Sequence, residues 1–218
     1  MRFNLFGFPV TIEASALLIA GVIALVGVRD RWTVPEIALT VLIGAVSILV
    51  HELGHAVSAR AFRLRPIEIS LHGLGGATTH PYSGSSWKEL GITVAGPLAG
   101  FGLALVALPA MFVLPASVQW VAETTFGLNV AWSVFNLLPI FPMDGGRALG
   151  FLLHGIVGPL LAWRVAHVVG AVLGGALAVY GLSTGDLWIG AVAGMFAWRN
   201  VERLQEISRV HTASRAFR

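Results

Sequence analysis

An apolar stretch from Glu36 to Phe62 is long enough to cross a membrane as one helix, yet it contains His51, Glu52 and His55. Such a helix needs about 20 mostly apolar residues, and ionisable side chains at that depth are rare and usually functional. On a helix, His51 and His55 are one turn apart and share a face, so both can bind one Zn²⁺ ion. Glu52 points about 100° away, where its carboxylate can reach a metal-bound water. The stretch therefore predicts a metal centre within a membrane.

Composition indicates that the rest of the chain also lies in a membrane. Hydrophobic residues make up 56% of the 218 and charged residues 11%, so polar side chains are too few to cover a water-soluble globule. Cysteine is absent, so a metal would have to use His, Asp or Glu. The formal net charge of the chain is +3, and in a membrane protein such a basic excess usually comes from cytoplasmic loops. We therefore expect no nucleic-acid partner.

We expect an all-α polytopic membrane protein with about six transmembrane helices and a small membrane-associated β-sheet or hairpin. The whole chain, residues 1–218, is interpreted as a single transmembrane domain that ends in a basic cytoplasmic tail at 199–218. The apolar runs that predict the helices lie at residues 14–28, 36–62, 87–113, 118–138, 159–180 and 187–204.

Basic residues predict the orientation of these helices. They gather between the second and third runs and at the end of the chain, and short loops rich in Arg and Lys stay on the cytoplasmic side. We therefore expect both termini in the cytoplasm, most naturally at a prokaryotic cell membrane. His51 would lie about 22 Å into the second run and nearer the cytoplasm. The basic residues concerned are Arg60, Arg63, Arg65, Lys88, Arg147, Arg199, Arg203, Arg209, Arg215 and Arg218.

Two short segments alternate apolar and polar residues and predict the sheet. They are 8–12 and 67–71, and the second is followed by three glycines and then by 77–80. A hairpin over 67–80 follows from this pattern, with a plain connecting loop as the alternative. Pro9 would confine its strand to an edge of the sheet. An open edge at 67–71, close to the metal, could bind an extended peptide by strand addition.

A catalytic zinc usually has three protein ligands, so a third ligand must come from elsewhere in the chain. The best candidate is Asp144, which follows Pro139 and Pro142 where the fourth run ends. Unwound backbone at membrane depth is tolerated only inside protein or beside a wet cavity, and an acidic residue there is a functional candidate. Alternatively, Asp144 caps a helix that starts at Gly145 or pairs with Arg147.

Two separated motifs carry a family resemblance. The first is His51-Glu52-Leu53-Gly54-His55 and the second, later in the chain, is Asn136-x-x-Pro139-x-x-Pro142-x-Asp144-Gly145. Together they resemble the site-2 protease family of intramembrane zinc metalloproteases. The segments Ala95-Gly96-Pro97 and Gly73 to Ala77 also resemble recurrent elements of that family. With neither a PDZ-like insertion nor a nucleotide-sensing (CBS) domain, the chain is similar to the small, core-only members.

The resemblance implies a function and a set of site residues. His51, His55 and Asp144 would bind one zinc ion, Glu52 would be the catalytic base, and Asn136 would lie near the scissile bond. The expected reaction is hydrolysis of a peptide bond within or near a transmembrane segment. Substrates would be single-span membrane proteins, such as precursors of transcription regulators or remnant signal segments.

Two other function classes remain open. A transporter of protons or metal ions could also place histidines and carboxylates at a broken helix, and a catalytically silent scaffold could keep the fold. Glu52 favours the protease, because a metal carrier needs no general base beside its first ligand. Further histidines, at 72, 80, 154 and 167, are more typical of interfacial or structural positions than of metal ligands.

Overall fold

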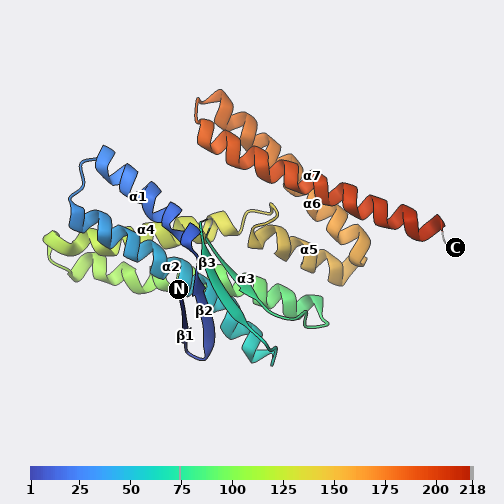
Figure 1. Ribbon diagram of the computed structural model, residues 1–218, viewed down its shortest axis with the longest axis horizontal. Coiled ribbons are helices and arrows are strands. Elements are labelled where there is room, and N and C mark those ends of the chain that lie inside the picture. Colours follow the sequence, from blue (N-terminus) through green and yellow to red (C-terminus); the bar gives the residue numbers. More distant parts are fainter. Residues whose placement is uncertain (74, 217–218) are drawn as a thin grey trace. The chain divides into compact units, whose positions relative to one another are not determined.

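The computed structural model describes residues 1–73 and 75–216 (Figure 1). Residue 74, in the predicted hairpin, and residues 217–218, at the end of the predicted basic tail, lie outside this range. Contacts divide the chain into two compact units. The first comprises residues 1–83 and 95–134, and the second comprises 84–94 and 135–218.

A four-stranded sheet in the order β1-β2-β3-β4 belongs to the first unit. Strand β2 pairs antiparallel with β1 and parallel with β3, and β3 pairs antiparallel with β4. Alternate residues of the two inner strands are buried, as the period of a half-buried strand requires. The predicted small sheet with a hairpin is confirmed. The strands are β1 Arg2–Leu5, β2 Phe8–Ile12, β3 Glu68–His72 and β4 Gly75–Thr79.

The first strand, β1, was absent from the sequence prediction. It joins β2 through a two-residue turn in which Phe6 and Gly7 have φ values of 51° and 84°. Turns of this kind match the twist of a hairpin, and Asn4 supports this one by accepting a hydrogen bond from the Gly7 N–H at 2.9 Å. The alternation of polar and apolar residues from Arg2 to Leu5 was the available signal.

Two predictions about the edges of the sheet are wrong. The segment at 67–71 is not an open edge, because β3 is paired with β2 on one side and β4 on the other. Strand β2, which contains Pro9, is not an edge strand either. It tolerates the proline because its pairing with β3 begins at Val10, beyond the residue that lacks an N–H. The strand left at the edge next to β3 is β4.

Helix α2 (Val34–Ala61) belongs to the first unit and carries the motif with His51, Glu52 and His55. Thr33 and Glu36 form a reciprocal capping box at its start, and Pro35 occupies the first turn. Its 28 residues extend about 42 Å, more than the hydrocarbon thickness of a bilayer. It follows α1 (Leu17–Arg29), which begins after a short 3₁₀ turn at Ala14–Ala16.

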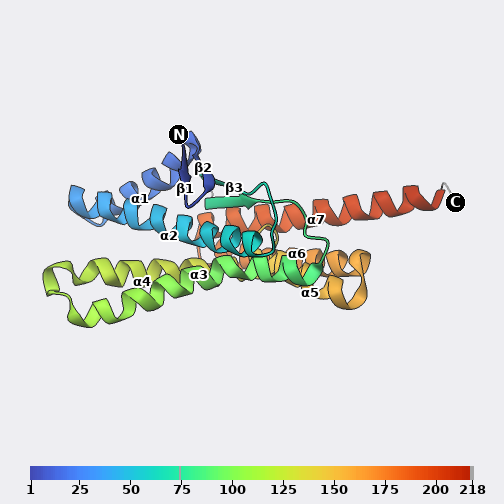
Figure 2. The same cartoon turned by 90° about the horizontal axis from the view of Figure 1, so that it is seen from below.

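Within the first unit, α2 lies between the sheet and an antiparallel helix pair (Figure 2). That pair consists of residues 95–113 of α3 (Ser86–Val113) and residues 116–134 of α4 (Ala116–Asn136). Gly54 on α2 packs directly against the Ala95 carbonyl of α3. On α4, Asn129 donates a hydrogen bond of 2.8 Å to the Ser47 hydroxyl of α2. Small and polar residues therefore bring three helices close together at the depth of the histidines.

The second unit contains three further helices. These are α5 (Asp144–Val157), α6 (Pro159–Ser183) and α7 (Leu187–Ala216). Gly158, with a φ of 81°, separates α5 from α6, and glycines on α6 allow α7 to pack closely along it. Helix α5 coincides with none of the predicted apolar runs. The predicted tail from 199 is helical as far as Ala216, because α7 continues past the last apolar residues.

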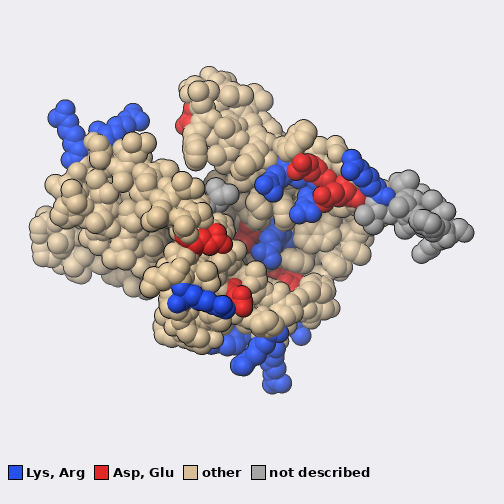
Figure 3. All heavy atoms as spheres, viewed as in Figure 1, with Lys and Arg blue, Asp and Glu red and all other residues tan. Residues whose placement is uncertain are grey.

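The prediction of a multi-pass membrane protein is confirmed. All six predicted runs coincide with helices, and of the described helices α2, α3 and α6 are long and apolar enough to cross a membrane. The helices at the other three predicted runs are less suited, since α1 has 13 residues, α4 carries Gln119 and Glu123, and α7 is charged along its second half. In Figure 3, the visible surface over α1 and α4 shows basic side chains at the tip of α1 and acidic ones near its start, with an uncharged stretch between them.

Candidate metal centre

The second half of α2 carries the three residues of the first motif. His51, Glu52 and His55 are all buried, with exposed fractions of 3%, 4% and 6%. One ligand atom from each residue lies within 4.8 Å of the other two. Burial of three ionisable side chains is costly unless something compensates for it, and a bound cation does so. The grouping predicted from spacing is therefore present in the folded chain.

The two imidazoles converge on a common point. Nε2 of His51 lies 3.2 Å from Nε2 of His55, and the ring planes meet at 81°. Two nitrogens that both bind a tetrahedral zinc at 2.0–2.1 Å are separated by about 3.3–3.4 Å. The observed separation fits a shared zinc ion closely. A carboxylate oxygen of Glu52 also lies within 4.8 Å of the ligand atoms of both histidines.

Strand β4 holds the carboxylate of Glu52. The Thr78 hydroxyl lies 2.8 Å from Oε2 of Glu52 and 3.0 Å from its backbone carbonyl oxygen, and its single proton is shared between these two acceptors. Gly76, two residues earlier, lies so close that a Cβ there would come within 2.6 Å of Oε1. The edge strand of the sheet therefore orients the carboxylate, and a glycine makes the close approach possible.

Helix α3 closes the other side of the centre. Gly96 lies against the imidazole of His55, and a Cβ at this position would collide with Nε2 and Cε1 of that ring. The next residue, Pro97, is fully buried within the helix and cannot donate a backbone hydrogen bond. The sequence pointed to Gly96 and Gly76 only through the resemblance of their segments to family elements, and Thr78 carried no signal of its role.

The second motif belongs to the second unit. Helix α4 ends at Asn136 and α5 begins at Asp144, so the break lies at the two prolines, as predicted. Asp144 is buried, with an exposed fraction of 7%. The residue at the N-cap of α5 is Met143, so the alternative in which Asp144 caps a helix starting at Gly145 is wrong. The assignment of Asp144 as a ligand and of Asn136 as a substrate contact stays a prediction.

The remaining histidines do not join the metal-ligand group found among the described residues. His167 is buried between α6 and α7, where its Nδ1 lies 3.0 Å from Oδ1 of Asn200. His72 ends β3, His80 follows β4 and His154 lies in the last turn of α5. The interpretation of His167 as a structural residue, with a hydrogen-bond partner inside the protein, agrees with this placement.

Known proteins resemble this chain along most of its length. Residues 38–125 match the family described as peptidase family M50. A zinc metalloprotease of Methanocaldococcus jannaschii is 29% identical over 218 residues, which cover 96% of this chain and 61% of that protein. A protein of Synechocystis is 28% identical over 234 residues, which cover 98% of this chain and 62% of that protein. This chain thus spans about three fifths of the length of these curated relatives.

A solved structure shows the same architecture. The site-2 protease from Methanocaldococcus jannaschii superposes with a TM-score of 0.72 at 26% identity, and the match covers 94% of both chains. That agreement extends beyond the first motif to the helices that follow it. Together with the matched family and the buried His51-Glu52-His55 group, it shows that the chain belongs to the site-2 protease family, peptidase family M50.

Proposed function

We propose that this protein is an intramembrane zinc metalloprotease that hydrolyses a peptide bond within or near a transmembrane segment of a membrane-protein substrate. The separation of 3.2 Å between the Nε2 atoms of His51 and His55, with Glu52 beside them, is the observation that carries the proposal. Asp144 completes the ligand set for one zinc ion per chain. The donor set, two imidazoles and a carboxylate, is one that catalytic zinc sites use.

In the reaction, Glu52 takes a proton from the attacking water and later delivers it to the leaving amine. Zinc, when bound, would acidify that water and polarise the scissile carbonyl. The hydrogen bond from Thr78 holds one oxygen of the Glu52 carboxylate, and the packing against Gly76 limits rotation of its side chain. Both contacts keep the base in one position, which a proton transfer over hydrogen-bond distance requires.

The substrate must be locally extended. A transmembrane helix satisfies its backbone groups internally, so its carbonyls become accessible only where the helix unwinds. Strand β4 is the edge strand that lies against Glu52, and it is the natural place for an extended segment to pair by strand addition. This edge replaces the one predicted at 67–71. Asn136 would contact the substrate near the scissile bond.

Cellular roles follow from the family. Substrates would be single-span proteins, including precursors of transcription regulators and remnant signal segments, in a prokaryotic cell membrane. Both termini of the protease would face the cytoplasm. The apolar helices α2, α3 and α6 would contact the lipid bilayer. The centre, in the second half of α2, would then lie closer to the cytoplasmic face than to the outer one.

The decisive experiment compares wild type with Glu52→Gln. We expect the variant to bind zinc in the same molar ratio and to lose cleavage of a tagged single-span substrate by at least roughly 100-fold, because general acid–base catalysis contributes about that much. Zinc content is measured by atomic absorption, and cleavage by immunoblot of the tagged product. Normal cleavage by a zinc-loaded Glu52→Gln protein would falsify the mechanism.

A further inference from the structure

A buried polar cluster joins α6 and α7 in the second unit. Asn200 on α7 is fully buried and His167 on α6 has an exposed fraction of 5%. Buried polar side chains are costly unless their hydrogen-bonding groups are satisfied. Neither residue belongs to the metal-ligand group, so the proposed reaction leaves this cluster without a role.

Every hydrogen-bonding atom of the Asn200 amide is used. Nδ2 donates to the carbonyl oxygen of Phe196, one turn earlier on α7, at 2.8 Å, and to that of Phe141 at 2.7 Å. Since these two bonds use both amide hydrogens, the atom facing His167 is the acceptor Oδ1, at 3.0 Å. His167 must therefore carry its proton on Nδ1, and the pair has a single orientation.

Phe141 is held from several sides of the second unit. Its ring lies 5.3 Å from that of His167 in an edge-to-face arrangement, and the guanidinium of Arg203 lies 6.0 Å from its centre. Gly170 on α6 leaves the space that the Asn200 amide occupies, since a Cβ there would come within 2.5 Å of Oδ1. Residues on both α6 and α7 thus contact Phe141 and hold it in place.

The loop from Phe141 to Asp144 connects the anchored Phe141 to the start of α5. The Met143 N–H donates to the Ile140 carbonyl at 2.9 Å, which closes a tight turn directly before α5. Gly146, in the first turn of α5, packs against the backbone of Ile140 and Phe141 with no room for a side chain. Because the loop lies directly on the helix start, a shift of Phe141 also shifts Asp144.

We propose that Asn200 and His167 are positioning residues that fix the Pro139–Asp144 loop and so hold Asp144 ready to bind zinc. The inference rests on the proposed function, in which Asp144 is the third ligand. The α6–α7 hairpin then serves the metal centre. Residues that orient metal ligands without touching the metal typically change metal affinity by roughly 10- to 100-fold.

The test is a double-mutant cycle on zinc affinity, measured on the full chain in detergent by competition with a chelator. Asn200→Ala is expected to weaken zinc binding by roughly 10- to 100-fold in the wild-type background. In an Asp144→Asn background the same substitution should have almost no further effect, because its influence passes through Asp144. Merely loosening the hairpin would lower affinity equally in both backgrounds.

Two further variants separate positioning from general packing. Gly181→Ala inserts a methyl group 2.5 Å from the Gly190 nitrogen at the far end of the same hairpin, and it should lower thermal stability without changing zinc affinity. His167→Ala should weaken zinc binding as Asn200→Ala does, whereas His167→Asn, which retains an N–H near the Nδ1 position, should restore most of it. If Asn200→Ala does not fold, His167→Ala and His167→Asn are each combined with Asp144→Asn in the same double-mutant cycle.

The possible failures are distinct. Normal zinc affinity of Asn200→Ala, or an equal loss in both backgrounds, overturns the positioning role and leaves the proposed function intact. Normal affinity of Asp144→Asn removes Asp144 from the ligand set, and it overturns the proposed site and this inference together. A loss confined to the background that retains Asp144, with Gly181→Ala unaffected, supports the inference.

Discussion

Glycines shape the metal centre as much as its ionisable residues do. His55 lies against Gly96 and Glu52 lies against Gly76, and in both cases a side chain would occupy the space of a functional group. The roles of His51, Glu52 and His55 could be predicted from their spacing, because residues one helical turn apart share a face whatever the rest of the chain does. The need for glycine at 76 and 96 could not, since it arises where other elements approach α2.

Replacing Gly96 with alanine should therefore impair the metal centre. The added methyl group collides with the His55 imidazole, so that ring must move away from the point on which it converges with His51. We expect zinc affinity to fall by at least roughly 10-fold, as measured by chelator competition. Gly102→Ala is the matched control on the same helix, because a Cβ there meets no atom within 4 Å. Equal zinc affinity of the two variants would contradict the packing described here.

At the scale of elements, strand β4 contributes more than the prediction of a small sheet implied. Strand existence could be predicted from alternating residues, but strand order could not, since it depends on pairing between segments more than fifty residues apart. Order decides function in this case. It places β3 in the interior and leaves β4, with Thr78, as the edge beside Glu52.

Thr78→Val tests the contribution of this strand. Valine keeps the shape of threonine but removes the hydroxyl that donates to Glu52 at 2.8 Å. We expect kcat to fall by roughly 10- to 100-fold, the equivalent of about 1–3 kcal/mol for a buried group that loses its partner, with unchanged zinc content. Thr79→Val is the control, because its hydroxyl contacts the Glu68 carbonyl at 3.4 Å and does not touch Glu52. Wild-type kcat in Thr78→Val would show that the hydroxyl has no catalytic role.

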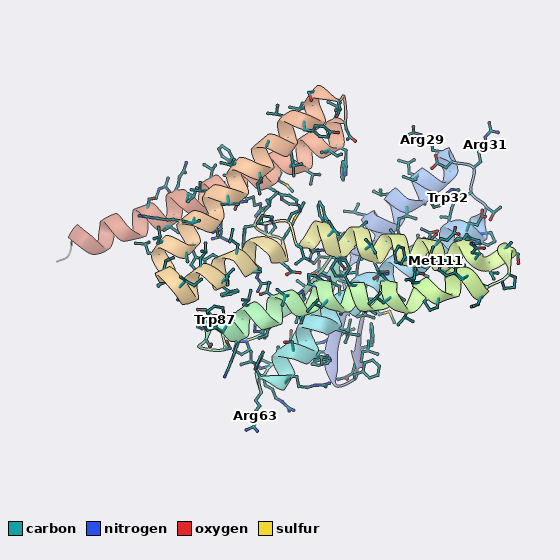
Figure 4. The ribbon with its side chains drawn as sticks, turned by 180° about the vertical axis from the view of Figure 1, so that it is seen from behind. Arg29, Arg31, Trp32, Arg63, Trp87 and Met111 are labelled. Atoms are coloured by element: carbon teal, nitrogen blue, oxygen red, sulfur yellow. The ribbon has the colours of Figure 1, made fainter. Side chains whose placement is uncertain are left out.

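At the scale of the whole molecule, the helices give the protein its place in a membrane. Figure 4 shows Arg29, Arg31 and Trp32 at the connection between α1 and α2, and Arg63 just beyond the opposite end of α2. A helix of 28 residues separates the two groups by more than the thickness of the hydrocarbon core. The orientation predicted from arginine counts puts Arg63 in the cytoplasm and Arg31 on the other side.

The absence of cysteine makes this orientation directly testable. Single substitutions Arg31→Cys and Arg63→Cys both lie at exposed positions with φ near 60°, at 60° and 62°, so each carries the same backbone strain. A membrane-impermeant maleimide added to intact cells should label Arg31→Cys only. Arg63→Cys should react only after permeabilisation, and the reverse pattern would invert the predicted topology.

The sequence alone determined the properties that depend on neighbouring residues: the membrane setting, the helices at the six apolar runs, and the shared face of His51 and His55. These could be predicted because helix periodicity and apolar length act within a single segment. Tertiary structure decided the strand order, the hold of Thr78 on Glu52, and the bond from Asn200 to Phe141, 59 residues away. No local pattern relates these segments: strand order depends on pairing between distant segments, and the contacts of Thr78 and Asn200 depend on the close approach that Gly76 and Gly170 allow.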